Sequence, residues 1–528
     1  MSLISNSSAC AAGAFPALTP VYGTEILAVH ASVVSNFTME ADSSLRYTSP
    51  SVVAQGLSFC NVTVVYTHSD TDDEVYVEAW LPPSESWNER LFTAGGSGFG
   101  AGRFLVPYTG MAGALTEGFA TVTSDAGLGS TLDDVTGAPW ILKSPGNVNL
   151  QLVQNFGSTS LKEEAVLAKQ LIEAFYGKKP EYSYFNGCSQ GGRQGMALAQ
   201  HYPEEYDGIL VGAPGINLPK VVGSIFWPQQ VMNEIGEHPH DCEIDAIVHA
   251  SISVCDKLDG VEDGVIAEYK KCLDTFDPFG EVGRNFTCWP PGEARLISAS
   301  AAAVVNATWR GMPLSGRQSW PGLNPGTNLT GTTGFQNGIC RTNCTGDGAC
   351  SGLYNALGNN WMKYFGAKNP DYSIDNLTRA EFQGFVRLTA QELASYFQTD
   401  DADLSPLQQA GGKLISWHGT ADDGVPPEGT AEYFRRVKDL IPEVGDFYQH
   451  YEIAGLAHCA GGSGGQPVEM FQQLRAWVEN GTVPENSPVT YTGPDSSVWK
   501  RIICPYPQKA TVKAGCEDLK SASCWQCA

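Results

Sequence analysis

The feature of this sequence that most restricts its fold is an alternation of short apolar segments with segments of helical periodicity. An apolar run of strand length ends at Gly187, a helical pattern follows Gly192, and a second apolar run begins at Gly208. Strands that alternate with helices in this way pair in parallel, because each crossover helix carries the chain back to where the previous strand began. We therefore expect an α/β fold. The run that ends at Gly187 begins at Tyr182, and other apolar runs begin at Glu74, Arg90 and Gly118.

The alternation fades over a long middle segment and returns near the end of the chain. Strand-like runs begin at Gly412 and Asp446, and helical patterns begin at Thr430 and Pro467. The middle segment is rich in Gly, Asn, Thr, Trp and Cys, which favours one insertion closed by disulfides. We expect a core in two parts, residues 1–215 and 411–528, interrupted by an inserted domain in residues 216–410. The tail that begins near Pro488 carries four cysteines and is expected to be disulfide-stapled.

The longest helical pattern begins at Ser160. Ser160 and Glu163 have the spacing of a capping box, in which each side chain bonds the backbone N–H of the other residue. We therefore expect a helix to begin at this serine.

Cysteines and glycosylation sequons indicate an oxidising, extracellular compartment. The fifteen cysteines are dispersed, which favours disulfides, and their odd number leaves at least one thiol unpaired or bonded between chains. The first ten residues lack an apolar segment, so we expect that a secretory signal peptide has been removed. N-glycosylation sequons begin at Asn6, Asn36, Asn61, Asn285, Asn306, Asn328, Asn343, Asn376 and Asn480.

Charge and hydropathy exclude two classes of partner. The formal net charge is −25, and Lys and Arg are not clustered as phosphate contacts require, so we expect no nucleic-acid partner. No apolar run reaches about 18 residues, so we expect no membrane span.

Two serines lie in a G-x-S-x-G pattern, which chance alone produces easily in a chain with 58 glycines. A nucleophilic serine of this type needs a strand before it and a helix after it, because the turn between them exposes the hydroxyl. Ser189 has both, whereas Ser463 lies in a glycine run with no adjoining strand. We therefore expect Ser189 to be the nucleophile and Ser463 to lie in a loop.

A serine nucleophile needs a histidine base and an acid that orients it, and in α/β hydrolases these follow in the order Ser, acid, His. His458 follows the last strand-like run and is the best candidate for the base. Asp422 follows the run before it and is the first choice for the acid, with Asp423 as the alternative. Three other histidines are better explained as helix, strand or supporting residues, namely His249, His450 and His418.

A cysteine adjoins both the serine and the histidine. Cys188 precedes Ser189, and Cys459 follows His458. Both adjacencies are improbable by chance in a chain with this cysteine content. A bond between the two cysteines would hold the loops of nucleophile and base together, so we expect the disulfide Cys188–Cys459.

The negative charge that develops on an ester carbonyl requires backbone N–H donors. One donor normally belongs to the residue after the nucleophile, which is Gln190. For the second we expect Gly96, with Gly95 as the alternative, in the glycine loop that follows an early strand. This loop lacks the G-K-[S/T] ending of a phosphate-binding loop.

A glycine-punctuated acidic loop follows Cys255. Asp256, Asp259 and Asp263 would repel one another unless a hard cation such as Ca²⁺ gathers them. A solvated acidic turn is the alternative. The spacing differs from that of an EF-hand loop.

The segments "GCSQGGRQG", "HGTADDGVP" and "AGLAHCAGG", which carry Ser189, Asp422 and His458, resemble the motifs of the tannase/feruloyl esterase family. The resemblance extends from about Cys60 to Cys504. It implies an α/β-hydrolase core with a large lid domain, here residues 216–410, and a structural Ca²⁺. The implied ligands are the side chains of Asp256, Asp259 and Asp263 and the carbonyls of Val261 and Val265. The resemblance also implies that the disulfide Cys255–Cys272 closes this loop.

The resemblance also implies a secreted enzyme that hydrolyses phenolic esters. We expect a feruloyl esterase acting on hydroxycinnamate esters of plant cell walls, because "CSQGGRQG" is closer to that branch. A tannase acting on gallate esters is the alternative, because the additional cysteine before the acidic loop, Cys242, resembles the pattern of the tannase branch. Two less favoured alternatives are a peptidase and an inactive, glycan-binding protein built on the hydrolase fold. The oligomeric state is left open.

Overall fold

A computed structural model describes the chain except residues 1–9, 16–17, 289–291, 315–316, 334–335 and 346–348. Its centre is a nine-stranded sheet in the order β1-β2-β3-β5-β4-β8-β9-β18-β19. Pairing is parallel from β5 to β19, which confirms the α/β fold. The other end, from β1 to the β3–β5 pair, is antiparallel and was not expected from the strand–helix alternation.

The strands of this sheet are β1 (Thr24–Ala41), β2 (Val52–His68), β3 (Val75–Leu81), β4 (Arg90–Ala94), β5 (Ala120–Ser124), β8 (Tyr182–Cys188), β9 (Gly208–Gly212), β18 (Lys413–Gly419) and β19 (Tyr448–Ile453).

Helices cover both faces of the parallel part, as alternate strand residues require. Tyr184 of β8 packs in a cluster with residues of α2 and α16, whereas the next residue, Phe185, packs with residues of α6 and α15. Both side chains are almost completely buried, so each face contributes a separate layer of the core. The helices are α2 (Leu105–Thr116), α5 (Ser160–Tyr176), α6 (Gln190–His201), α15 (Pro427–Leu440) and α16 (Met470–Asn480).

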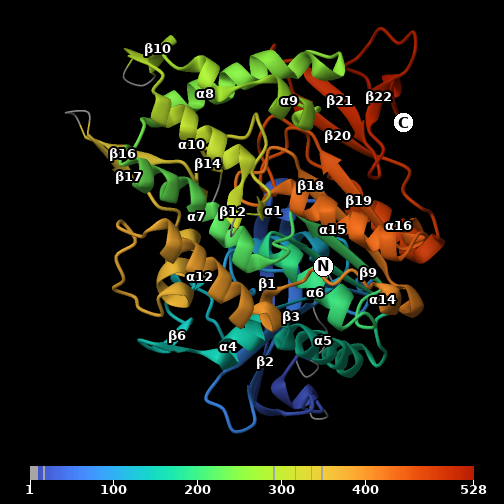
Figure 1. The fold of residues 1–528 in the computed structure, drawn as a ribbon. Coiled ribbons are helices and arrows are strands. Elements are labelled where there is room, and N and C mark those ends of the chain that lie inside the picture. The colour runs from blue at the N-terminus through green and yellow to red at the C-terminus, as the bar shows by residue number, and fades with distance from the viewer. Residues whose placement is uncertain (1–9, 16–17, 289–291, 315–316, 334–335, 346–348) are drawn as a thin grey trace.

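The segment between β9 and β18 contributes no strand to the large sheet among its described residues. In Figure 1 its helices α7, α8, α9, α10 and α12 lie along one side and the top of the molecule, whereas α14 lies beside α6. The first five of these helices share one hydrophobic cluster with Phe99, Trp140 and Phe156 of the core, so the insertion rests directly on core loops. The domain limits at residues 215/216 and 410/411 stay predictions. The helices are α7 (Leu218–Ile235), α8 (Asp241–Cys255), α9 (Tyr269–Thr275), α10 (Ala299–Arg310), α11 (Ala356–Asn360), α12 (Arg379–Glu392), α13 (Ala394–Phe397) and α14 (Ser405–Ala410).

Disulfides account for every cysteine but one. Cys340 is the unpaired thiol, and its complete burial raises the pKa of that thiol to about 12, so it is protonated and enclosed. The C-terminal tail, with the hairpin β20 (Ser487–Thr492) and β21 (Val498–Ile503), is stapled as expected. The seven bonds are Cys10–Cys60, Cys188–Cys459, Cys242–Cys288, Cys255–Cys272, Cys344–Cys350, Cys504–Cys527 and Cys516–Cys524.

The predicted capping box is wrong, because α5 does not begin freely at Ser160. A short helix α4 (Leu150–Gln154) and a π-helical turn (Asn155–Thr159) run into it without a break. The Ser160 hydroxyl donates to the Asn155 carbonyl instead of capping the helix. The upstream helical turns supply the partners that a cap would otherwise provide.

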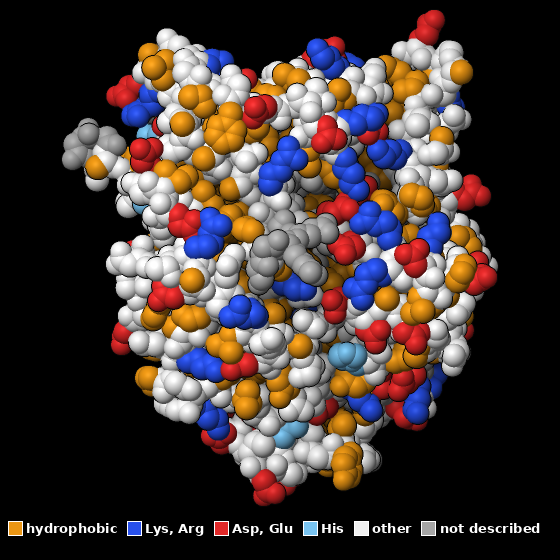
Figure 2. Space-filling model, viewed as in Figure 1, with side chains coloured by type: hydrophobic (Ala, Val, Ile, Leu, Met, Phe, Trp, Pro, Cys, Tyr) orange, Lys and Arg blue, Asp and Glu red, His pale blue; other side chains and the backbone are white. Residues whose placement is uncertain are grey.

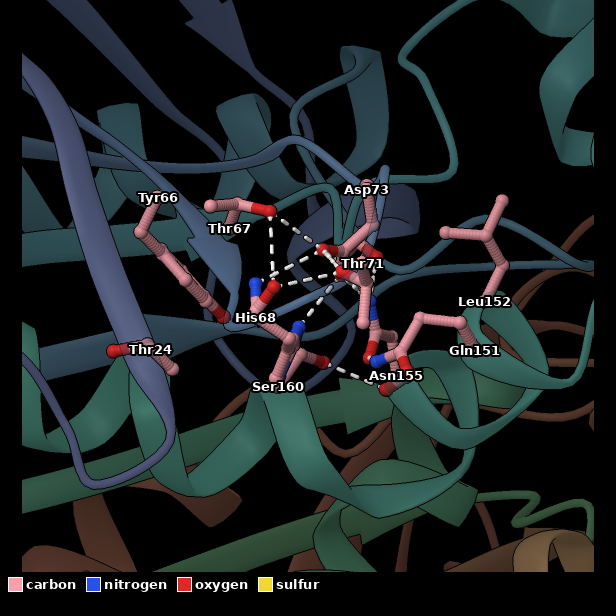
Figure 3. Close-up of polar contacts among 12 residues, drawn as sticks. Thr24, Tyr66, Thr67, His68, Thr71, Asp73, Gln151, Leu152, Asn155 and Ser160 are labelled. Carbon is pink, nitrogen blue, oxygen red and sulfur yellow. Dashed lines mark hydrogen bonds and ion pairs between the residues drawn. The ribbon is translucent and has the colours of Figure 1, made fainter.

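Glu163, the other half of the predicted capping box, belongs to a polar cluster that joins β2 to α5. Figure 3 shows other members of this cluster, among them Tyr66, His68 and Asp73. The Glu163 carboxylate accepts from the Tyr66 hydroxyl at 2.6 Å and lies 3.0 Å from His68 Nε2. The other ring nitrogen of His68, Nδ1, lies 2.6 Å from Asp73, which also accepts from the Asn155 amide at 2.8 Å. One imidazole therefore lies between two carboxylates.

No helix in the part of the chain that the structure describes is both long and apolar enough to cross a membrane.

Candidate active site

Ser189 occupies a sharp turn between β8 and α6. Its backbone has φ 63° and ψ −118°, a conformation that costs a non-glycine residue about 1–3 kcal/mol. The turn is possible because glycines flank it. A Cβ on Gly187 would lie 2.6 Å from the Gly191 carbonyl carbon, and one on Gly191 would lie 2.9 Å from the Gly96 oxygen. The serine is partly exposed, whereas the residues on either side of it are buried.

Ser463, the other serine in a G-x-S-x-G pattern, lies outside any helix or strand and is exposed. Ser189 thus has a strand before it and a helix after it, whereas Ser463 has neither.

Asp422 follows β18 and lies 2.7 Å from Nδ1 of His458, which follows β19. Its other oxygen accepts from the N–H groups of Gly424 and Val425 at 2.8 and 2.7 Å. Burial alone would raise the pKa of the Asp422 carboxyl, but the charge of His458 and hydrogen bonds from two histidines hold it well below its usual range. Asp422 is therefore ionised and oriented toward His458.

Burial works against a charged His458, but the charge and hydrogen bond of Asp422 outweigh it and raise the pKa of the ring. With Nδ1 on Asp422, Nε2 carries the lone pair. Nε2 is buried and has no hydrogen-bond partner among the described residues, Ser189 included. In enzymes without substrate, the contact between nucleophile and base is often long.

Asp422 binds a second imidazole, that of His418 at the end of β18. His418 Nε2 lies 3.1 Å from the carboxylate, and its Nδ1 lies 2.8 Å from the Thr430 hydroxyl. This position agrees with the supporting role expected for His418. Asp423, the alternative acid, is also buried, but the hydrogen bond to His458 comes from Asp422.

The remaining histidines lie where their patterns place them. His249 is exposed on α8. His450 lies inside β19, where complete burial lowers the pKa of its ring to about 3.

The disulfide Cys188–Cys459 is present, with a Cα–Cα distance of 5.9 Å across a sequence separation of 271 residues. It joins the end of β8 to the loop after β19. The loop that carries His458 is thus covalently attached to the residue before Ser189, as the adjacent cysteines predict.

The structure contradicts the expectation that Gly96 is the second oxyanion donor. Its N–H already donates to Gln194 Oε1 at 2.8 Å, and the N–H of Gly95 donates to the Asn186 carbonyl at 3.0 Å. The N–H of Gln190, by contrast, has no acceptor in the described part of the chain and lies at the first position of α6.

The same loop offers one other donor, Gly98. The N–H groups of Ser97 and Gly100 bond each other's carbonyls at 3.2 and 2.9 Å, and that of Phe99 bonds the Val135 carbonyl at 2.8 Å. Among the described residues, no acceptor is found for the Gly98 N–H. The sequence does not distinguish these glycines, because their hydrogen bonds depend on distant residues.

Arg193 supports the start of α6 and was not anticipated from the sequence. Its side chain is completely buried and donates to Gln190 Oε1 at 2.8 Å and to the carbonyls of Phe156 and Gly157 at 2.6 and 2.9 Å. Burial lowers the pKa of the guanidinium to about 9. The only sequence signal is its position one helical turn after Ser189.

The acidic loop expected to bind Ca²⁺ contacts the C-terminal tail. Arg501 of β21 lies 2.7 Å from Asp263 and 3.3 Å from Asp259, and the Tyr491 hydroxyl also donates to Asp263. Burial raises the pKa of both Asp259 and Asp263, so the loop benefits from nearby positive charge. The disulfide Cys255–Cys272 closes the loop.

The donor set of this loop has the chemistry of a hard-cation site. The carbonyls of Val261 and Val265, two buried residues, accept no hydrogen bond from any described residue. Asp256, however, accepts from the N–H groups of Asp263 and Gly264, and Arg501 supplies part of the positive charge. Oxygen ligands are present and Ca²⁺ fits them, so calcium stays a prediction.

A different group, His240 with Cys242 and Cys288, has ligand atoms within 4.8 Å of one another. The two cysteines are bonded to each other and offer no thiolate, so this group is not a metal site.

The sequons differ in accessibility. Asn61 is half-buried and its amide nitrogen donates to Glu78 at 3.0 Å, and Asn306 is also half-buried. Asn6 lies outside the described residues. The exposed sequon residues are Asn36, Asn285, Asn328, Asn343, Asn376 and Asn480.

Known proteins resemble this chain over nearly its whole length. The family model "Tannase and feruloyl esterase" matches residues 60–528. A probable feruloyl esterase of Arthroderma benhamiae is 34% identical over 490 residues, covering 91% of this chain and 87% of that protein. A tannase of Aspergillus oryzae is 25% identical, with 88% and 86% coverage. The structure of a tannin acyl hydrolase from Aspergillus niger superimposes with a TM-score of 0.86 at 25% identity, covering 99% of this chain and 95% of that one.

Proposed function

Because the chain belongs to the tannase and feruloyl esterase family, we propose that it is a secreted serine esterase that releases hydroxycinnamic acids from plant cell-wall polysaccharide. As a member of this family it is a carboxylic ester hydrolase with an α/β-hydrolase fold. The observation that carries the proposal is the arrangement around Ser189: a strained turn, the His458–Asp422 pair, and a disulfide that joins their loops.

In the proposed reaction, the Ser189 hydroxyl attacks the ester carbonyl while His458 Nε2 takes its proton. The imidazolium then gives this proton to the departing alcohol, and the acyl group stays on the serine. Water, deprotonated by the same nitrogen, attacks the acyl-enzyme and releases the phenolic acid. Asp422 holds Nδ1–H of His458 and stabilises the charged ring throughout.

Two backbone donors face the developing oxyanion in this proposal. They are the N–H groups of Gln190 and Gly98, which lack acceptors among the described residues. Arg193 fixes the Gln190 side chain and therefore the first turn of α6. Calcium, held by the Asp256–Val265 loop, would supply structural cross-linking between the lid and the tail.

The proposed substrate preference rests on the sequence identity to each relative. The chain is 34% identical to the probable feruloyl esterase and 25% identical to the tannase, which supports hydroxycinnamate over gallate esters. Gallate remains the alternative substrate class. Secretion is supported by the seven disulfides, which persist in oxidising compartments.

The decisive variant is Ser189→Ala, assayed with methyl ferulate and methyl gallate. We expect turnover to fall by at least about 10³-fold. The matched control, Ser463→Ala, removes the other serine in the same motif and should keep wild-type activity. Undiminished turnover by Ser189→Ala would exclude it as the nucleophile, and faster wild-type turnover of the gallate would favour the tannase alternative. Cleavage of a peptide but neither ester would favour a peptidase.

A further inference from the structure

A cavity of about 670 Å³ lies between the lid and the core, and Ser189, Asp422 and His458 do not line it. Residues of α9 and α10 form its lid side, and residues of α15 form its core side. Figure 2 shows a hollow near the middle of this face with Lys and Arg side chains around it. The charged residues that line the cavity are Lys220, Lys270, Arg310, Arg435, Glu428 and Glu432.

The cavity has an aromatic wall. Trp309 and Trp320 line it, together with Tyr269. Both indole nitrogens are buried behind this wall and have no acceptor among the described residues. The wall therefore offers a ligand aromatic carbon surface, against which a sugar ring can pack.

The charge in the cavity is positive, although the chain as a whole carries −25. Glu428 pairs with Lys270 at 2.9 Å and with Arg435 at 2.6 Å, so this carboxylate is already engaged by two cations. The Lys220 ammonium lies over the Trp320 ring, 5.4 Å from its centroid, and has no salt bridge with any described carboxylate. With four cations against two carboxylates, the cavity favours an anionic ligand.

Hydrogen bonds connect segments that line the cavity with the segments that carry Ser189 and Asp422. Lys220 lies on α7, which follows Gly215, and the Gly215 N–H donates to the Ser189 carbonyl at 3.2 Å. On the other side, the Asn324 amide donates to the carbonyl of Thr420, two residues before Asp422. A ligand in the cavity and an ester at the serine are therefore held by one connected framework.

We propose that this cavity binds a uronic acid unit of the polysaccharide that carries the ester. A sugar ring packs against the aromatic wall, and its carboxylate faces the Lys220 ammonium. A drug-sized ligand fills cavities of about 300–1,000 Å³, so there is room for a short oligosaccharide. The identity of the ligand rests on the proposed function, since the polysaccharide is its substrate.

The test is direct binding without any ester, measured by calorimetry and tryptophan fluorescence. Trigalacturonic acid is compared with xylotriose, a neutral sugar of the same length, and with ferulate. We expect the acidic sugar to bind at least about tenfold more tightly than the neutral one, with affinity that falls as salt rises. Lys220→Met and Trp320→Leu should each weaken binding about tenfold.

The control Lys143→Met removes an exposed lysine that pairs with Asp72 on another surface, and it should bind as the wild type does. Trp320→Phe keeps an aromatic ring of smaller area, so it should bind with intermediate affinity if Trp320→Leu is unstable. Equal binding of both sugars, preference for ferulate, or unchanged binding by Lys220→Met would each overturn the proposal. No outcome depends on hydrolysis, so failure here and failure of the esterase proposal are separate results.

Discussion

Replacing His68 with glutamine should destabilise the fold by about 3 kcal/mol below pH 6.5 and by much less at pH 10. The ring lies between the Asp73 and Glu163 carboxylates, and only 13% of its side chain is exposed. Figure 3 shows His68 beside Asp73. Burial alone would lower the pKa of His68, but hydrogen bonds to the two carboxylates and their charges outweigh it and raise the pKa to about 10. Glutamine keeps one hydrogen bond but leaves two partly buried carboxylates without a cation.

The magnitude follows from the two protonation equilibria. A tenfold change in proton affinity is worth about 1.36 kcal/mol, so moving the pKa of His68 from 6.5 to about 10 sets an upper limit of about 5 kcal/mol. Because the folded pKa is the higher one, the stabilisation is complete below pH 6.5 and disappears as the pH rises through about 10. Residual solvent contact and the remaining hydrogen bond reduce the expected value to about 3 kcal/mol.

The assay is denaturant unfolding of wild type and His68→Gln at several pH values from 6 to 10. The difference in free energy of unfolding should shrink steadily over this range, whereas the control His30→Gln, at an exposed position on the neighbouring strand β1, should stay within about 0.5 kcal/mol of wild type. A difference that stays constant from pH 6 to 10 would refute the conclusion that His68 is charged in the folded protein.

Three further predictions concern the site and the acidic loop. Asp422→Asn should lower kcat by about three to four orders of magnitude with little change in KM, because His458 loses the partner that fixes its tautomer; an unchanged kcat would remove Asp422 from the triad. The double variant Cys188→Ser/Cys459→Ser should lower kcat and Tm together, since the loop of the base is no longer tied to the nucleophile, and steady-state kinetics beside thermal melting would measure both; a fall in Tm alone would mean that the bond serves stability only. EDTA should lower Tm, added Ca²⁺ should restore it, and Asp259→Ala should abolish both responses; elemental analysis without calcium would contradict the metal site.

The local parts of the site could be predicted from the sequence. Ser189 needs glycines on both sides and a strand before it, and these are neighbours in the chain. The adjacent cysteines likewise indicated which histidine lies beside the serine, because a disulfide permits only a short distance between its residues.

The first strands of the sheet were harder to predict, because strand–helix alternation describes only its parallel part. β1 and β2 pair with each other antiparallel, and β2 continues this pairing to β3. The capping-box prediction was also wrong because it considered only residues that are close in the sequence. The Glu163 carboxylate instead contacts Tyr66 and His68, about a hundred residues away.

The sequence by itself determined the α/β fold, the family, and the three segments that carry Ser189, Asp422 and His458, because each depends on residues close together in the chain. Only the tertiary structure decided that the Gly96 N–H is engaged, that the Gly98 N–H has no acceptor among the described residues, and that Arg501 lies against the acidic loop. It also placed His418 and His458 on one carboxylate. The physical reason is common to all three. Whether a polar group is free or engaged depends on which distant residue packs against it, and that is set by the fold as a whole.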